Sequence, residues 1–214
     1  MLETDHIKSF VRKLGIDLVG VADMTTLKGM PLGISAEGAS YLDQFPRAIV
    51  LGAQHGKIGK KAKGGEVSIF LESAALKVME YLEEKGKQGL IIHTDEEYNP
   101  VTRHGLLSLK VLAKAAGLGW QGRSLLIISP EYGPVHRWIA VLTDLDLSPD
   151  RSLSNMCAAC CLCVEKCPQH ALTFVPFEDH PESREAVLNV PACRGDDGCK
   201  VCMVVCPWIR QAIY

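Results

Sequence analysis

Cysteines dominate the C-terminal part of this 214-residue chain. Five of them fall within the twelve residues "CAACCLCVEKCP" (157–168), and all nine lie between Cys157 and Cys206. In a reducing compartment such a density of thiols indicates metal binding, because structural disulfides seldom persist there. The distribution therefore predicts a C-terminal metal-binding module.

The spacing of the cysteines indicates which metal they hold. The first run reads C-x2-C-x2-C-x3-C-P, the pattern that binds a [4Fe–4S] cluster in bacterial ferredoxins, and a second run reads C-x5-C-x2-C-x3-C-P. In two-cluster ferredoxins the fourth cysteine of each run ligates the other cluster. We therefore predict two [4Fe–4S] clusters. The first cluster would be held by Cys157, Cys160, Cys163 and Cys206, and the second cluster by Cys167, Cys193, Cys199 and Cys202.

Two structural zinc sites of four thiolates each are the alternative, since paired C-x2-C elements also occur in zinc ribbons. A zinc ribbon requires neither the x2-x2-x3 spacing nor a proline after both fourth cysteines, so the spacing favours the clusters. Cys161 lies outside both runs, and we expect it to be unliganded.

The overall composition limits the partners. The 23 Lys and Arg residues are balanced by 25 Asp and Glu residues, which argues against a nucleic-acid partner and against an anionic membrane surface. The N-terminus has acidic residues where a signal peptide would be basic and then apolar. We expect a cytoplasmic protein without membrane spans.

The rest of the chain alternates between strand and helix patterns. Short β-branched runs predict strands at 16–23, 47–53, 89–94, 125–129 and 137–145, and helical periodicity predicts helices at 68–85 and 106–116. The expected fold class is α+β. An N-terminal α/β layered domain, residues 1–149, would precede a two-cluster ferredoxin-like module, residues 150–214, with a Ser-, Pro- and Asp-rich connector at 145–155.

A glycine-rich stretch between the last predicted helix and strand is a candidate cofactor-binding loop. Its glycines would allow close approach of the backbone to a ligand, while an indole and a guanidinium offer a flat face and a cation. The candidate residues are Gly117, Gly119, Trp120, Gly122 and Arg123. A helix cap followed by a turn is the simpler explanation of the same residues.

Three segments in the same order resemble the epoxyqueuosine reductase family. They are "LAKAAGLGWQGRSLLI" (112–127), the first cysteine run, and "GCKVCMVVCPWIR" (198–210). The resemblance implies an N-terminal cobalamin-binding domain, and a two-cluster module that receives electrons from a ferredoxin or flavodoxin and passes them to the cobalt. Reductive dehalogenases share this layout more distantly.

Two features depart from that family. Its proton-donor Asp, in a D-x-x-P-V-L-E-R segment, aligns with Arg103, and its Glu aligns with Leu109. The family continues past the clusters into a helical-repeat domain that helps to grip tRNA, whereas this chain ends at Tyr214. We therefore expect a short form that does not reduce a tRNA base. Asp95 and Tyr98 are the nearest other proton donors in the sequence.

Two functions remain open. The first is an oxidoreductase in which the clusters relay single electrons to a corrinoid-type cofactor or a substrate in the N-terminal domain. The second is a ferredoxin-like carrier of electrons between partner proteins, with the N-terminal domain as a docking scaffold. The large non-cluster region favours the first, because a simple ferredoxin does not need it to build a core.

Overall fold

The chain folds into two compact units. The computed structural model describes residues 2–28, 36–56, 64–93, 105–195 and 198–209. The sheet unit consists of Met1–Leu118 and His136–Ser152, and the cysteine unit consists of Gly119–Val135 and Leu153–Tyr214. The single boundary expected after residue 149 differs from this division, because the segment Gly119–Val135 groups with the cysteines.

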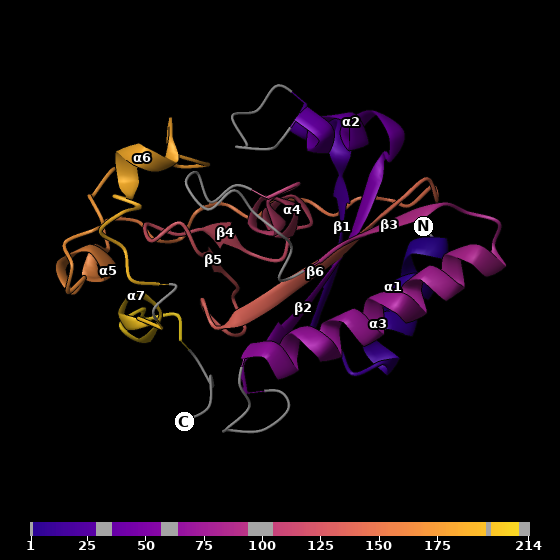
Figure 1. Cartoon of the computed structure of the whole chain (residues 1–214), viewed down its shortest axis with the longest axis horizontal. Coiled ribbons are helices and arrows are strands. Elements are labelled where there is room, and N and C mark those ends of the chain that lie inside the picture. Colours follow the sequence, from indigo (N-terminus) through magenta and orange to yellow (C-terminus); the bar gives the residue numbers. More distant parts are fainter. Residues whose placement is uncertain (1, 29–35, 57–63, 94–104, 196–197, 210–214) are drawn as a thin grey trace. The chain divides into compact units, whose positions relative to one another are not determined.

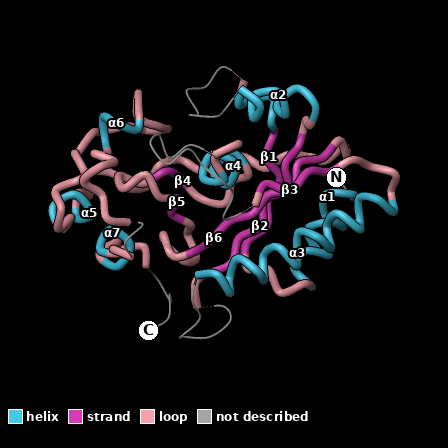
Figure 2. The backbone as a smooth tube through the Cα atoms, viewed as in Figure 1, coloured by secondary structure: helices cyan, strands magenta, loops and turns pink. Residues whose placement is uncertain are grey.

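One antiparallel sheet with strand order β1-β2-β6-β3 forms the centre of the sheet unit (Figures 1 and 2). The register places Ile49 between Val21 and Val141, so that β-branched side chains lie side by side across three strands. The strands lie close to four of the predicted ones. Their bounds are β1 (Leu18–Asp23), β2 (Arg47–Gln54), β3 (Gly89–Ile92) and β6 (His136–Thr143).

Helices cover both faces of this sheet. Helices α1 (Leu2–Lys13) and α3 (Gly64–Glu84) share one buried apolar core with the sheet (Figure 1). Helix α4 (Leu109–Ala115) lies on the opposite face, where a Cβ on Gly20 would come within 2.3 Å of the Ala116 carbonyl oxygen. The layered mixture of helix and sheet that the sequence predicts is thus present. None of the helices within the described ranges is long and apolar enough to cross a membrane.

Helix α1 was not among the elements predicted from the sequence. Its buried Ile7 and Val11 are four residues apart, and its ends carry charges that suit the helix dipole: Glu3 and Asp5 in the first turn, and basic residues in the last. This short amphipathic pattern was the available signal.

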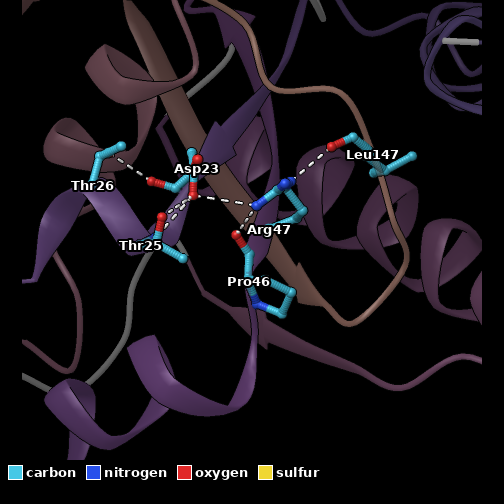
Figure 3. A network of polar contacts seen from close by, with 6 residues as sticks. All are labelled: Asp23, Thr25, Thr26, Pro46, Arg47 and Leu147. Atoms are coloured by element: carbon cyan, nitrogen blue, oxygen red, sulfur yellow. Dashed lines mark hydrogen bonds and ion pairs between the residues drawn. The ribbon is translucent and has the colours of Figure 1, made fainter.

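A polar network fixes the end of β1 to the start of β2 (Figure 3). Arg47 donates from Nη1 to Asp23 Oδ1 at 3.2 Å and from Nε to the Leu147 carbonyl at 2.7 Å. Burial acts to raise the pKa of Asp23, but hydrogen bonds from Thr25 and the charge of Arg47 hold it below its ordinary value. The network lies beside the 3₁₀ turn η1 (Met24–Leu27), and helix α2 (Ala36–Gln44) follows along the chain.

The segment after β6, expected to be a connector, is instead fastened to the sheet unit. Asp150 accepts hydrogen bonds from Lys8 Nζ at 2.6 Å and from the Val21 amide at 2.8 Å, and its own amide donates to the Val21 carbonyl. The Ser148 amide donates to Thr4 Oγ1 at 2.8 Å. These hydrogen bonds and the buried Leu147 agree with the grouping of residues up to Ser152 with the sheet unit.

Short elements make up the cysteine unit. Strands β4 (Trp120–Gln121) and β5 (Ile127–Ile128) form a hairpin. The helices are α5 (Leu162–Glu165), α6 (Arg184–Val187) and α7 (Val201–Val204). Leu125 of the hairpin packs with Leu172 and Val187, and this small core also contacts Cys163, Cys167 and Cys202. The predicted strand at 125–129 therefore belongs to the cysteine unit and not to the N-terminal domain.

Candidate iron–sulfur site

The thiol of Cys163 lies among cysteines of both runs. Burial raises its pKa to about 12, and the nearby charges of Cys157, Cys202, Cys160 and Cys206 add to this effect. Burial also raises the pKa of Cys206; a backbone hydrogen bond from Trp208 lowers it, and Cys157 and Cys160 raise it again. The three cysteines Cys157, Cys160 and Cys163 therefore lie near Cys206 of the second run.

Cys202 lies near two other cysteines of its own run and near the fourth cysteine of the first run. Burial raises its pKa to about 11, with further increases from Cys193, Cys199 and Cys167. Cys167, the fourth cysteine of the first run, is thus near the three cysteines of the second run. This grouping supports the predicted exchange of fourth cysteines between the clusters, and the ligand sets stay a prediction.

The backbone presents the third cysteine of each run in the same way. Cys163 is the second residue of α5, and Cys202 is the second residue of α7. Ahead of α5, the Cys160 amide donates to the Cys157 carbonyl at 2.9 Å, and Ala158 has a positive φ of 46°. The two runs therefore place corresponding thiols through similar short helical turns.

Burial and the nearby thiols keep Cys163 and Cys202 protonated near neutral pH when no metal is present, because their pKa values are raised to about 12 and about 11. A thiolate ligand must lose its proton, and a bound cation compensates the crowded negative charge that raises these pKa values. A group of four thiols from two runs has the donor chemistry that a [4Fe–4S] cluster requires. Within the described ranges, no three His, Cys, Asp or Glu side chains are placed to share a single metal ion.

Cys161 has a different environment. Its thiol donates a hydrogen bond to Glu165 Oε1 at 2.9 Å, and this bond, burial and the carboxylate charge raise its pKa. The geometry gives Cys161 a partner of its own, and its unliganded state remains a prediction.

Other parts of the chain fill the space beside the glycines of the candidate cofactor loop. Gly117 has a φ of +69°, and a Cβ there would lie 2.5 Å from the Arg151 carbonyl oxygen. A Cβ on Gly119 would lie 2.4 Å from the Ile128 carbonyl oxygen, and one on Gly122 would lie 2.8 Å from Ile128 Cγ1. Internal packing accounts for all three glycines, as the helix-cap and turn interpretation expects. These glycines do not form an open cradle for a corrinoid.

The other two residues of that loop are also engaged inside the cysteine unit. Trp120 is 1% exposed, and its ring meets the Trp208 ring edge to face at 4.8 Å. Arg123 is 7% exposed and donates from Nη2 to the Ala158 carbonyl at 3.0 Å. These contacts give no support to Arg123 as a cofactor-binding cation, because its guanidinium donates to carbonyl groups inside the cysteine unit.

Asn155 is a residue of this site that the sequence analysis did not identify. Its Nδ2 donates to the Gln121 carbonyl at 2.9 Å, while its Oδ1 accepts from the Cys157 amide at 2.9 Å. It thus joins the hairpin to the first ligand residue. The only signal was an Asn two positions before the first cysteine, a spacing that suits an Asx turn. The proton-donor positions, Arg103, Asp95 and Tyr98, lie outside the described residues.

Comparisons with known proteins agree with the resemblance. No protein-family model matches the chain. An epoxyqueuosine reductase of Synechocystis sp. is 29% identical over 172 residues, 73% of this chain and 56% of that protein. The enzyme of Listeria monocytogenes is 32% identical over 120 residues, 50% of this chain and 31% of that protein. The chain thus spans about half or less of these relatives.

Solved structures share the fold at low sequence identity. An epoxyqueuosine reductase with a modified tRNA-Tyr stem loop matches 98% of this chain and 66% of its own, with a TM-score of 0.70 and 16% identity. The reductive dehalogenase NpRdhA with 3-bromo-4-hydroxybenzoic acid matches 96% of this chain and 32% of its own, with a TM-score of 0.72 and 21% identity. The chain is therefore similar to epoxyqueuosine reductases in both sequence and fold, as its three motifs predict.

Proposed function

We propose that this chain is an iron–sulfur reductase that passes single electrons through two [4Fe–4S] clusters. The first cluster would be ligated by Cys157, Cys160, Cys163 and Cys206. The second would be ligated by Cys167, Cys193, Cys199 and Cys202. Bound clusters supply one-electron transfer at potentials that the protein sets by charge, hydrogen bonds and burial.

One observation carries this proposal: each third cysteine is surrounded by its own run and by the fourth cysteine of the other run. This arrangement is the one that two-cluster ferredoxins use. The sequence relatives, all named as reductases, favour an enzyme over a simple carrier.

A corrinoid is the proposed electron acceptor. Support comes from the fold shared with a dehalogenase whose structure is described as suggesting B12-dependent dehalogenation. We assign no residue of this chain to the corrinoid, because the candidate loop is filled by its own side chains and carbonyls. An electron-donor protein of the ferredoxin or flavodoxin type would reduce the clusters.

The substrate to test first is epoxyqueuosine in tRNA. The names of the relatives and the tRNA stem loop in one related structure lead to this choice. It revises the expectation, drawn from the charge balance and from Arg103, that a nucleic-acid partner is improbable. A small organohalide is the second substrate class, given the shared fold with the dehalogenase.

The test is anaerobic reconstitution of the whole chain, followed by iron and sulfide analysis. Two clusters require close to eight of each per chain. The loaded protein is then titrated with cobalamin and with flavin, and the visible spectrum is recorded. Finally, it is assayed with modified tRNA and with halophenols under a chemical reductant. About four iron atoms per chain, or a colourless protein that contains zinc, would contradict the proposal. Two full clusters without binding of cobalamin or flavin would favour the alternative function, an electron carrier between partner proteins.

A further inference from the structure

Arg123 carries a guanidinium that is buried beside the first ligand loop. It donates from Nη2 to the Ala158 carbonyl at 3.0 Å, and Ala158 directly follows Cys157. From Nη1 it donates to the Val175 carbonyl at 3.2 Å and to the Phe177 carbonyl at 2.9 Å. One side chain thus ties the hairpin to two other segments of the cysteine unit.

The positive charge of Arg123 has no anionic partner among the residues that the structure describes. Its contacts are carbonyl groups and the rings of Phe174 and Phe177, whose centroids lie 5.6 and 4.7 Å from Cζ. Its Nε is buried and makes no hydrogen bond within the described ranges. Burying a charge is costly unless an opposite charge compensates it, so an anion close to this guanidinium would stabilise it.

The contact with Arg123 is made at a left-handed turn of the first ligand loop, at Ala158. Ala158 has a φ of +46°, a conformation that is unfavourable for a residue with a Cβ. The Ala158 carbonyl accepts the hydrogen bond from Arg123, so this contact stabilises the turn beside Cys157.

We propose that Arg123 positions the first cluster and favours its reduced state. This inference rests on the proposed ligation of the first cluster by Cys157, Cys160, Cys163 and Cys206. A [4Fe–4S] cluster with four thiolates is an anion, and reduction adds one electron to it. A buried cation next to its ligand loop stabilises the added charge and makes the reduction potential less negative.

Other contacts of the segment Gly119–Val135 reach the chain just after Cys206, the remaining ligand of the first cluster. Trp120 packs on Trp208, and a Cβ on Gly133 would lie 2.3 Å from the Trp208 carbonyl oxygen. Trp208 follows Cys206 by two residues. The segment Gly119–Val135 therefore contacts both chain segments that would supply the first cluster, one through Arg123 and the other through Trp120 and Gly133.

The test compares Arg123→Gln, Arg123→Lys and the control Arg184→Gln in the reconstituted full chain. Arg184 lies in the same unit and already pairs with Glu185 at 2.8 Å. Potentials are measured by redox titration monitored by electron paramagnetic resonance. The first cluster is identified as the signal that is missing from Cys160→Ser.

Arg123→Gln is expected to shift the potential of the first cluster to a more negative value and to leave that of the second cluster nearly unchanged. Arg123→Lys, which keeps the charge, should shift it less, and Arg184→Gln should not shift it. If Arg123→Gln fails to load the first cluster, loading by Arg123→Lys near the wild-type potential supports the inference.

Three results would overturn the inference. The first is an unchanged potential of the first cluster in loaded Arg123→Gln. The second is an equal loss of both clusters in both Arg123 variants. The third is that both variants are less stable but the first cluster has the same potential in Arg123→Lys as in Arg123→Gln. Wild-type protein that binds no clusters would instead contradict the proposed function, so the two failures are distinguishable.

Discussion

At the scale of single residues, the close spacing of the cysteine thiols affects their pKa values. Cys163 and Cys202 have raised pKa values because each is buried and surrounded by other thiols. Thiols brought together in this way remain neutral until a metal displaces their protons. Cys161, beside Glu165, has a raised pKa for a different reason, the hydrogen bond to a carboxylate.

This difference predicts how serine substitutions affect the clusters. Cys160→Ser should abolish the first cluster, because serine is a poor ligand for iron, and iron content should fall to roughly half. Cys161→Ser should leave iron, sulfide and the visible spectrum at wild-type values. Equal losses in the two variants would show that the register of the first run is wrong.

A second residue-scale prediction concerns a polar contact in the sheet unit. Tyr81 donates to Glu3 at 2.5 Å and Lys85 lies 3.0 Å from the same carboxylate. These two hydrogen bonds hold the pKa of Glu3 below its ordinary value of 4.5. The contribution of Glu3 to stability is therefore complete above pH 4.5 and is lost as the pH falls through its lower folded-state pKa.

Replacing Glu3 by Gln should lower the Tm by roughly 1–3 °C at pH 7, since the carboxylate is partly exposed. Below pH 4.5 the difference from the wild type should shrink towards zero. Thermal unfolding followed by circular dichroism measures both values. Glu80→Gln is the control, because Glu80 pairs with Lys77 on an exposed surface. A Tm difference for Glu3→Gln that is constant with pH would contradict this explanation.

At the scale of elements, the hairpin of β4 and β5 is tightly packed and is expected to support the cluster loops. Its glycines are required because the chain packs against itself there. If Gly119 lined a corrinoid site, a valine there would block the cofactor and spare the clusters. With Ile128 only 2.4 Å from a Cβ at this position, we now expect the hairpin and the cluster loops to be disturbed instead.

Two glycines with similar backbone angles provide a matched test of this role. Gly133 (φ +62°) and Gly86 (φ +65°) both adopt left-handed conformations, so alanine costs roughly 1–2 kcal/mol at either site. A Cβ on Gly133 would also meet the Trp208 carbonyl, whereas one on Gly86 has nothing within 4 Å. Gly133→Ala should lose iron from the first cluster, and Gly86→Ala should keep all its iron. Iron analysis that finds both variants fully loaded would exclude the contact of Gly133 with Trp208 as a support of the cluster.

Local patterns predicted most elements of the sheet unit, since short β-branched runs and the period of α3 are encoded within each segment. The antiparallel strand order was not predictable in this way, because it depends on long-range pairing such as that of Ile49 with Val141. The position of the hairpin was missed for a similar reason. Arg123 contacts carbonyls 35 to 54 residues farther along the chain, and no spacing rule reveals such contacts. The cysteine grouping was predicted from the sequence because its spacing is itself the motif, and the ligand sets stay a prediction.

At the scale of the whole molecule, the chain passes from one unit to the other three times. It leaves the sheet unit after Leu118, returns at His136, and leaves again after Ser152. A single cut near Pro149, which the sequence suggested as a clean separation, would remove Asp150 from Lys8 and Val21 and would leave the hairpin with the wrong fragment.

Two fragments test this arrangement. Residues 1–149 should unfold at lower temperature than a fragment that ends at Ser152 and has residues 119–135 replaced by a short Gly/Ser linker. The second fragment keeps the Asp150 contacts and exposes no unpartnered hairpin. Circular dichroism melting and limited proteolysis compare the two. Equal melting temperatures would mean that neither the Asp150 contacts nor the hairpin matter to the sheet unit.

The interrupted path of the chain also sets an order of events during protein synthesis. The hairpin leaves the ribosome before any cysteine, and its partner Trp208 follows only after the second cysteine run. At roughly 5–20 residues per second, the hairpin waits for several seconds without the surfaces that bury Trp120 and Arg123. The sheet unit can close around β6 in that interval, whereas the cysteine unit can form only after the second cysteine run has been made. Iron insertion therefore follows the folding of the sheet unit, and a nascent chain stalled before Trp208 would display the apolar hairpin to chaperones.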